Sequence, residues 1–236
     1  MSSFILPADY PRIKRVSSFQ ELITTPFADG LNAFCWQRDL LGDFGEIVNK
    51  LGATEEITTL DESLLRGLPL SKAGRLAVDQ LLKDYRLLKD HDLEPALNCI
   101  GDYPHDENPG PVATDVFSFH ADSAPVPADT YLCTYFGPAS EGLRNHEARR
   151  RVDIPETRAQ LLKLFGGHDD DAFCEYLKEN CYDLHYAAAP SARPFSFGIG
   201  NLWRIATEYP GSPVPPCIHR APPTLPGAPA RLLLIS

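Results

Sequence analysis

The chain lacks the long apolar runs and the paired cysteines that would point to a membrane or an oxidising compartment. No apolar run approaches the roughly 18 residues that favour a membrane-spanning helix, and no signal peptide is recognisable. The six cysteines are scattered, without a CxxC pair. Cys174 and Cys181 fall in one expected helix, about 10 Å apart along its axis, which is too far for a disulfide. These absences favour a cytoplasmic protein with reduced thiols.

Positive charge is also scarce. The 236 residues include 22 Lys and Arg against 32 Asp and Glu, a net charge of −10. This balance argues against a nucleic-acid surface, and nothing indicates a membrane partner. The one basic run, "RNHEARRR" (144–151), is typical of a solvated helix or loop face, and a patch for an anionic substrate is the alternative. The sequence leaves the oligomeric state open.

The first 94 residues have mostly helical patterns. The clearest helix is predicted over 71–91, where apolar residues recur at helical spacing and form one stripe. Ser18 and Glu21 have the spacing of a capping box at a helix start. Residues 31–40 are short, apolar and aromatic, which predicts a strand. We interpret this region as a helical support for the rest of the chain.

From about residue 95, short apolar runs alternate with Pro- and Gly-rich turns. This spacing is typical of an antiparallel β-sandwich or barrel, so residues 95–154 and 190–236 are expected to form a β core. Residues 155–189 carry two helical patterns and are expected to be an insert in that core. We therefore interpret 1–236 as one domain, mainly β with helical additions.

The segment "VFSFHADSA" (116–124) combines a predicted strand with chemistry-bearing side chains. Successive residues of a strand point to opposite faces, so His120 and Asp122 are expected on the same face. Together they supply two ligands of a 2-His-1-carboxylate metal site with open positions, the set used by non-haem Fe(II) oxygenases.

A second histidine is needed to complete such a site. The candidates are His91, His105, His146, His168, His185 and His219. His219 stands out because it ends the apolar run "VPPCIH", and Arg231 follows twelve residues later at the start of the last predicted strand. A guanidinium there would bind a carboxylate through two hydrogen bonds. In the alternative interpretation, His120 and Asp122 only bond to each other and His219 is a core histidine.

His120, Asp122, His219 and Arg231, in this order, resemble the Fe(II)/2-oxoglutarate-dependent oxygenase superfamily. More narrowly, the segments "FHAD", "LCTYFGP", "IHRAPP" and "RLLL" are similar to a family of small, uncharacterised bacterial proteins. The Gly198-Ile199-Gly200 turn adds to the likeness, which covers residues 110–236 well and the first 100 poorly. It implies a double-stranded β-helix (a jelly roll, cupin-like), with Fe(II) on the three ligands and the distal carboxylate of 2-oxoglutarate on Arg231.

The resemblance also implies an activity. Such enzymes use O2 and 2-oxoglutarate to oxidise a C–H bond and release succinate and CO2. Because halogenating members have a small residue in place of Asp122, its presence favours hydroxylation, desaturation or another oxidation. An amino acid or a natural-product intermediate is the expected substrate.

Four further residues receive roles by position in this resemblance. Ser140 and Thr134 are candidates for co-substrate binding, and Tyr135 and Arg220 for substrate binding. A surface salt bridge is an equal alternative for Arg220, and at most one of Thr134 and Tyr135 can point inward. The helical insert is expected to act as a lid that selects the substrate.

Two other classes of protein stay open. One is a cupin-like barrel that binds a metal or small ligand without redox chemistry, and the other is a structural or interaction protein with a relic site. Arg231 distinguishes the first from an oxygenase, because a metal-binding protein needs no carboxylate-binding arginine beyond the distal histidine.

Overall fold

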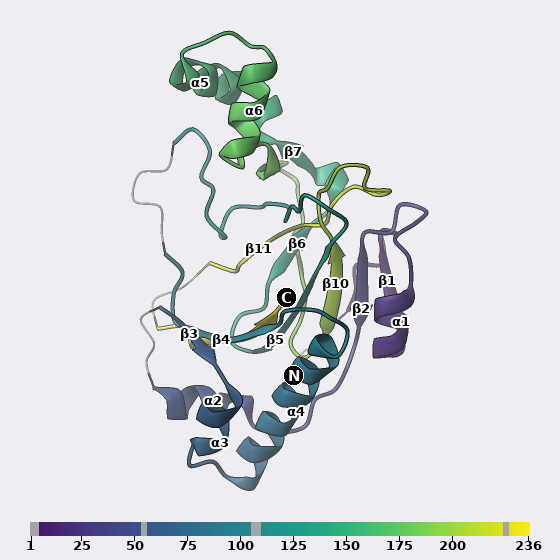
Figure 1. The fold of residues 1–236 in the computed structure, drawn as a ribbon, viewed down its shortest axis with the longest axis vertical. Coiled ribbons are helices and arrows are strands. Elements are labelled where there is room, and N and C mark those ends of the chain that lie inside the picture. The colour runs from purple at the N-terminus through teal and green to yellow at the C-terminus, as the bar shows by residue number, and fades with distance from the viewer. Residues whose placement is uncertain (1–4, 53–55, 105–109, 224–226) are drawn as a thin grey trace.

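The computed structural model describes residues 5–52, 56–104, 110–223 and 227–236. Within these ranges the fold is mixed α/β, with one large sheet that six helices accompany (Figure 1). The strands of this sheet follow the spatial order β1 (Ile13–Val16), β2 (Ala33–Trp36), β10 (Leu202–Ala206), β5 (Asp129–Phe136), β12 (Arg231–Ile235), β4 (Ala96–Ile100) and β3 (Ile57–Leu60). All neighbours are antiparallel except β1 and β2.

A smaller sheet packs against the large one. Its order is β11 (Ile218–Arg220), β6 (Glu141–Leu143) and β9 (Phe195–Ser196). A separate antiparallel pair, β7 (Ala148–Arg150) with β8 (Tyr186–Ala188), leads toward the helical insert. The apolar layer between the two sheets includes Leu132 and Trp203 from the large sheet and Phe195, Phe197 and Cys217 from the side of the small one.

The segment 116–124 is not the regular strand that the sequence predicts. Asp115 Oδ1 accepts hydrogen bonds from the backbone N–H groups of Phe117 and Ser118, which bends the chain where the strand was expected. Only isolated bridges form beyond this bend: His120 and His219 exchange two backbone hydrogen bonds of 2.9 Å, and His120 also pairs with His185. His120 therefore still sits beside β11, as a strand residue would.

The helices confirm part of the predicted pattern. They are α1 (Phe19–Thr24), α2 (Phe44–Leu51), α3 (Glu62–Gly67), α4 (Lys72–Lys89), α5 (Pro155–Phe165) and α6 (Asp171–Glu179). The predicted helix over 71–91 is α4, and the insert contains α5 and α6. The first 94 residues, expected to be mostly helical, also supply three strands of the large sheet. None of the helices in the described ranges is long and apolar enough to cross a membrane.

Helices α2 and α4 cover the face of the large sheet that is turned away from the small sheet. The apolar stripe of α4 packs into this core through Val78, Leu81, Leu82 and Leu88. Strand β5 alternates between the two layers, so Tyr131, Cys133 and Tyr135 face the helices while Leu132 faces the small sheet. The side of β5 on which a residue stands thus decides whether it can reach a site between the sheets.

An ion pair lies almost entirely buried in the helix-covered core. Arg38 Nη1 donates to Asp84 Oδ1 on α4 at 2.8 Å, and the two side chains are 7% and 0% exposed. Tyr135 and Gln80 donate to the same carboxylate, at 2.7 and 3.0 Å. Arg38 also donates to the carbonyl of Gly200. The pair therefore ties α4 to β5 and to the turn before β10.

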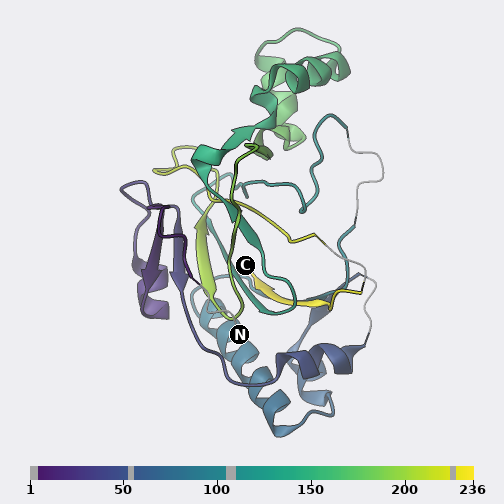
Figure 2. The ribbon, with the colours of Figure 1, turned by 180° about the vertical axis from the view of Figure 1, so that it is seen from behind.

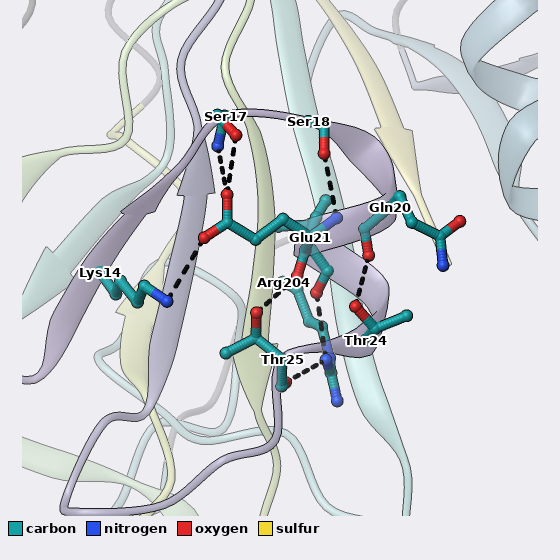
Figure 3. Close-up of polar contacts among 9 residues, drawn as sticks. Lys14, Ser17, Ser18, Gln20, Glu21, Thr24, Thr25 and Arg204 are labelled. Atoms are coloured by element: carbon teal, nitrogen blue, oxygen red, sulfur yellow. Dashed lines mark hydrogen bonds and ion pairs between the residues drawn. The ribbon is translucent and has the colours of Figure 1, made fainter.

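Helix α1 is held at both ends (Figure 3). Ser18 Oγ accepts from the N–H of Glu21, as the capping-box spacing predicts, but the Glu21 carboxylate binds Ser17. At the other end, Arg204 of β10 donates to the carbonyls of Leu22, Ile23 and Thr25. A cation at the carboxyl end of a helix complements its exposed carbonyls. Arg204 thereby fixes α1 on the large sheet.

The helical insert projects beyond the sheets. Figures 1 and 2, from opposite sides, both show α5 and α6 standing apart from the rest of the molecule. Leu161, Phe173 and Leu177 of these helices form a small apolar cluster with Val112 and Val152, which precede the insert. The basic run before the insert does not form one exposed face, because Arg144 is 6% exposed and pairs with Asp9.

Candidate metal centre

Three side chains named from the sequence converge between β11 and the segment around residue 120. One ligand atom each from His120, Asp122 and His219 lies within 4.8 Å of the other two. His120 Nε2 is 3.9 Å from Asp122 Oδ1, and His219 Nε2 is 3.7 Å from Asp122 Oδ2. Two atoms that are each about 2.1 Å from one ion lie at most about 4.2 Å apart. Both of these distances satisfy that limit.

Backbone carbonyls orient both imidazoles in the same way. His120 Nδ1 lies 2.7 Å from the carbonyl oxygen of Ser118, and His219 Nδ1 lies 3.3 Å from that of Cys217. A carbonyl accepts but cannot donate, so each Nδ1 carries the proton and each Nε2 presents its lone pair to the centre. A metal-binding histidine is commonly held this way through its other ring nitrogen.

The carboxylate is also held in place. Thr130, at the second residue of β5, donates its hydroxyl proton to Asp122 Oδ2 at 2.6 Å. Asp122 further accepts the N–H of Glu208 on its backbone carbonyl. The Asp122 side chain is 32% exposed, whereas that of His219 is 8% exposed. The three donors thus form a half-open set in which the carboxylate is the accessible member.

The charge states at neutral pH suit a divalent cation. Burial, followed by the proximity of His219, lowers the pKa of His120 to about 4. Burial alone would raise the pKa of Asp122, but His219, the Thr130 hydrogen bond and His120 outweigh it and the pKa falls. A neutral imidazole and an ionised carboxylate are the forms that bind metal.

Arg231 begins β12, facing the space between the sheets. It is 6% exposed and donates to the carbonyl of Pro138, to Tyr103 Oη and to Ser140 Oγ, at 2.8, 3.0 and 3.0 Å. No carboxylate of the described residues forms an ion pair with it. Burial lowers the pKa of Arg231. A buried guanidinium without a counter-ion is costly, and an anionic ligand would remove that cost.

The other predicted site residues divide between the two faces. Ser140 contacts Arg231, and Thr134 is buried on the same face of β5 as Thr130. Tyr135 lies on the opposite face, where it donates to Asp84 and stacks on Phe44, so it does not reach the candidate metal ligands.

Arg220 also points away from the ligands. Its neighbour on β11, His219, faces the centre, and alternation turns Arg220 to the other side. There it forms a 2.7 Å ion pair with Glu141 and lies over the ring of Phe119. The structure therefore favours the salt-bridge interpretation of Arg220.

A pocket opens directly beside the candidate metal ligands. Its lining includes His120, Asp122, Asp115, Cys181, Leu184 and His185. Cys181 and Leu184 follow α6, so the end of the insert contributes to the pocket wall although α5 and α6 themselves stand apart. His185 is 5% exposed, and burial, followed by the nearby Arg151, lowers its pKa to about 4.

The sequence did not reveal Thr130, Tyr103 and His185 as parts of this region. Thr130 and Tyr103 had no motif to mark them, because their roles depend on long-range pairing. His185 was one of the six candidate histidines, and its place in the polar end of a helical pattern gave no reason to choose it. Another candidate, His105, lies outside the described residues.

The chain matches no protein-family model, no curated protein and no solved structure in comparisons with known proteins. The function must therefore be argued from the site.

Proposed function

We propose that the protein is a non-haem Fe(II)/2-oxoglutarate-dependent oxygenase that oxidises a small molecule. The convergence of His120, Asp122 and His219 carries this proposal, because two imidazoles and one carboxylate with open positions are the ligand set of such enzymes. Arg231 supports it independently, since a buried guanidinium that forms no ion pair with any described residue suits the distal carboxylate of 2-oxoglutarate.

The strand pairing supports a double-stranded β-helix for the core. Eight segments can be numbered along the chain: β4, the stretch at His120, β5, β6, β9, β10, β11 and β12. The first pairs with the eighth, the second with the seventh, the third with the sixth and the fourth with the fifth, all antiparallel. This nested pairing is that of a long antiparallel ribbon folded into two sheets, as in a jelly roll.

The protein's own residues would have distinct tasks in the reaction. Bound Fe(II) would supply the capacity to bind and activate O2. His120, Asp122 and His219 would hold it, and Thr130 would keep the carboxylate oriented. Arg231, with Ser140 and Tyr103 around it, would fix the co-substrate at its far end. The pocket beside Asp122 would position the substrate, so that the oxidised carbon lies near the open face of the metal.

The first test is an anaerobic titration with Fe(II) and then 2-oxoglutarate. Chelation of Fe(II) by an α-keto acid produces a visible charge-transfer absorption, which we expect in the wild-type protein. Arg231→Lys keeps the positive charge but cannot form the bidentate hydrogen bond to a carboxylate. The dissociation constant for 2-oxoglutarate should therefore rise roughly 10- to 100-fold. Fe(II) binding should not change.

Arg220→Lys is the matched control, because Arg220 is adjacent to His219 but faces away from the centre. It should leave both affinities unchanged. If metal binds and no absorption forms in the wild type, the oxygenase proposal fails and a cupin-like binding protein without redox activity replaces it.

The insert offers a second test of the proposed architecture. We expect that replacing Pro155–Glu179 by a short Gly/Ser linker changes which substrates promote succinate release, while Fe(II) affinity stays within about twofold. The reason is that α5 and α6 pack in an apolar cluster that is separate from the cores on the two faces of the large sheet. Of the described residues outside the insert, only Val112 and Val152 share that cluster, whereas the chain after α6 lines the pocket. Metal titration and a substrate screen measure the two effects. Loss of metal binding would contradict a lid role.

A further inference from the structure

The pocket beside the metal ligands has one charged group that the metal would not use. Asp115 Oδ1 is occupied by the N–H groups of Phe117 and Ser118, at 3.1 and 3.0 Å. Its Oδ2 accepts no hydrogen bond from any described residue, and no ion pair to Asp115 forms within the described ranges. The pocket lining includes no lysine or arginine among these residues. The charges of Fe(II), Asp122, Arg231 and the 2-oxoglutarate dianion add up to zero. In the complex that the proposed function requires, Asp115 therefore gives the pocket beside the metal an uncompensated negative charge.

A second polar group in this pocket also lacks a hydrogen-bond partner among the described residues. His185 is 5% exposed, and its Nδ1 is buried without a hydrogen bond. Neither ring nitrogen bonds to another described residue. Burying an imidazole without hydrogen bonds costs free energy. A ligand that forms a hydrogen bond with Nε2 of His185 would recover part of this cost. Arg151 and, more weakly, Asp115 both act on His185 electrostatically, but of these two charged residues only Asp115 lines the pocket with His185.

We propose that this pocket binds a substrate through a protonated amine, with Asp115 as its counter-ion and His185 as a hydrogen-bond partner. The inference rests on the proposed function for the position of the metal, but it names the chemical class that function leaves open. An ammonium donates to a carboxylate in a charge-assisted hydrogen bond, which is among the stronger polar contacts. An anionic substrate group would meet repulsion from Asp115.

Three probes of equal length isolate the charge: n-butylamine, 1-butanol and butyrate. Ligand-observed NMR under anaerobic conditions measures their binding to the protein in the presence of Fe(II) and saturating 2-oxoglutarate, which keeps butyrate from the open positions of the metal. We expect n-butylamine to bind at least about tenfold more tightly than 1-butanol, and butyrate to bind least. Asp115→Asn should abolish this preference, because the amide keeps an oxygen for the turn at residues 117 and 118 but has no charge. Asp169→Asn, on the exposed insert, is the matched control and should keep it.

The outcomes separate the two proposals. An amine preference that is absent in the wild type, or that survives in Asp115→Asn, overturns the amine inference. NMR reports probe binding whether or not the Fe(II)–2-oxoglutarate absorption forms. Failure of that absorption with an intact amine preference therefore overturns the oxygenase proposal alone.

Discussion

Replacing His219 by alanine is expected to lower the affinity for Fe(II) by more than about 100-fold. Loss of a residue that hydrogen-bonds to a metal ligand typically lowers the metal affinity 10- to 100-fold. His219 is proposed to bind the metal directly, so its loss should lower the affinity further. Its Nε2 lies 3.7 Å from the Asp122 carboxylate and its Nδ1 is held by the carbonyl of Cys217. Activity measured as succinate release should disappear together with the binding.

His168→Ala is the control for this experiment. His168 is exposed in the loop after α5 and has no contact with the ligands. Calorimetric titration with Fe(II) should give the wild-type affinity for it. An equal loss in both variants would mean that the measurement reports a general disturbance. Unchanged affinity in His219→Ala would remove the ligand set on which the proposed function depends.

The second large effect is expected in the core, on the face of the large sheet opposite the proposed metal ligands. Asp84→Ala should lower the free energy of unfolding by about 3–5 kcal/mol, because it leaves the buried Arg38 without its counter-ion. Arg38 is 7% exposed, so water cannot replace the carboxylate. Tyr135 would also lose the acceptor of its hydroxyl proton. Equilibrium unfolding in urea measures the change.

Two further variants test the cause. Asp79 lies on the same helix and forms an exposed ion pair with Arg66. Asp79→Ala should therefore change the free energy of unfolding only slightly, as surface substitutions usually do. Arg38→Met combined with Asp84→Leu removes both charges and should recover much of the loss. If Asp84→Ala is no more harmful than Asp79→Ala, the buried pair does not hold α4 to the sheet.

Much of the fold could be predicted where an apolar repeat extends over several helical turns or where turn residues bound an apolar run. The helix at Lys72–Lys89 follows from its apolar stripe, and β4, β5 and β12 follow from apolar runs bounded by turn residues. The proximity of His120 and Asp122 could be predicted because side chains two residues apart on an extended chain point to the same face. The two side chains do lie close together, although the segment is not a regular strand.

The remainder depended on contacts that the sequence does not encode locally. Strands β1 and β3 have four residues each, too few for a period to emerge, and one is a mixture of apolar and basic residues. The face of Tyr135 is fixed by how β5 aligns with β10 and β12. The Thr130 contact with Asp122, and the place of His185 next to His120, likewise arise only once distant segments pair.

The position of β12 has a consequence for how the chain reaches its native state. It is the last strand in the sequence, yet it lies between β4 and β5 in the middle of the large sheet. Until it arrives, β4 and β5 each present a row of unpaired N–H and C=O groups, and such open edges attract strands of other chains. The pairing of β4 with β12 closes a long loop, which slows folding and prolongs that exposure. Self-association during synthesis is therefore the hazard that this topology carries.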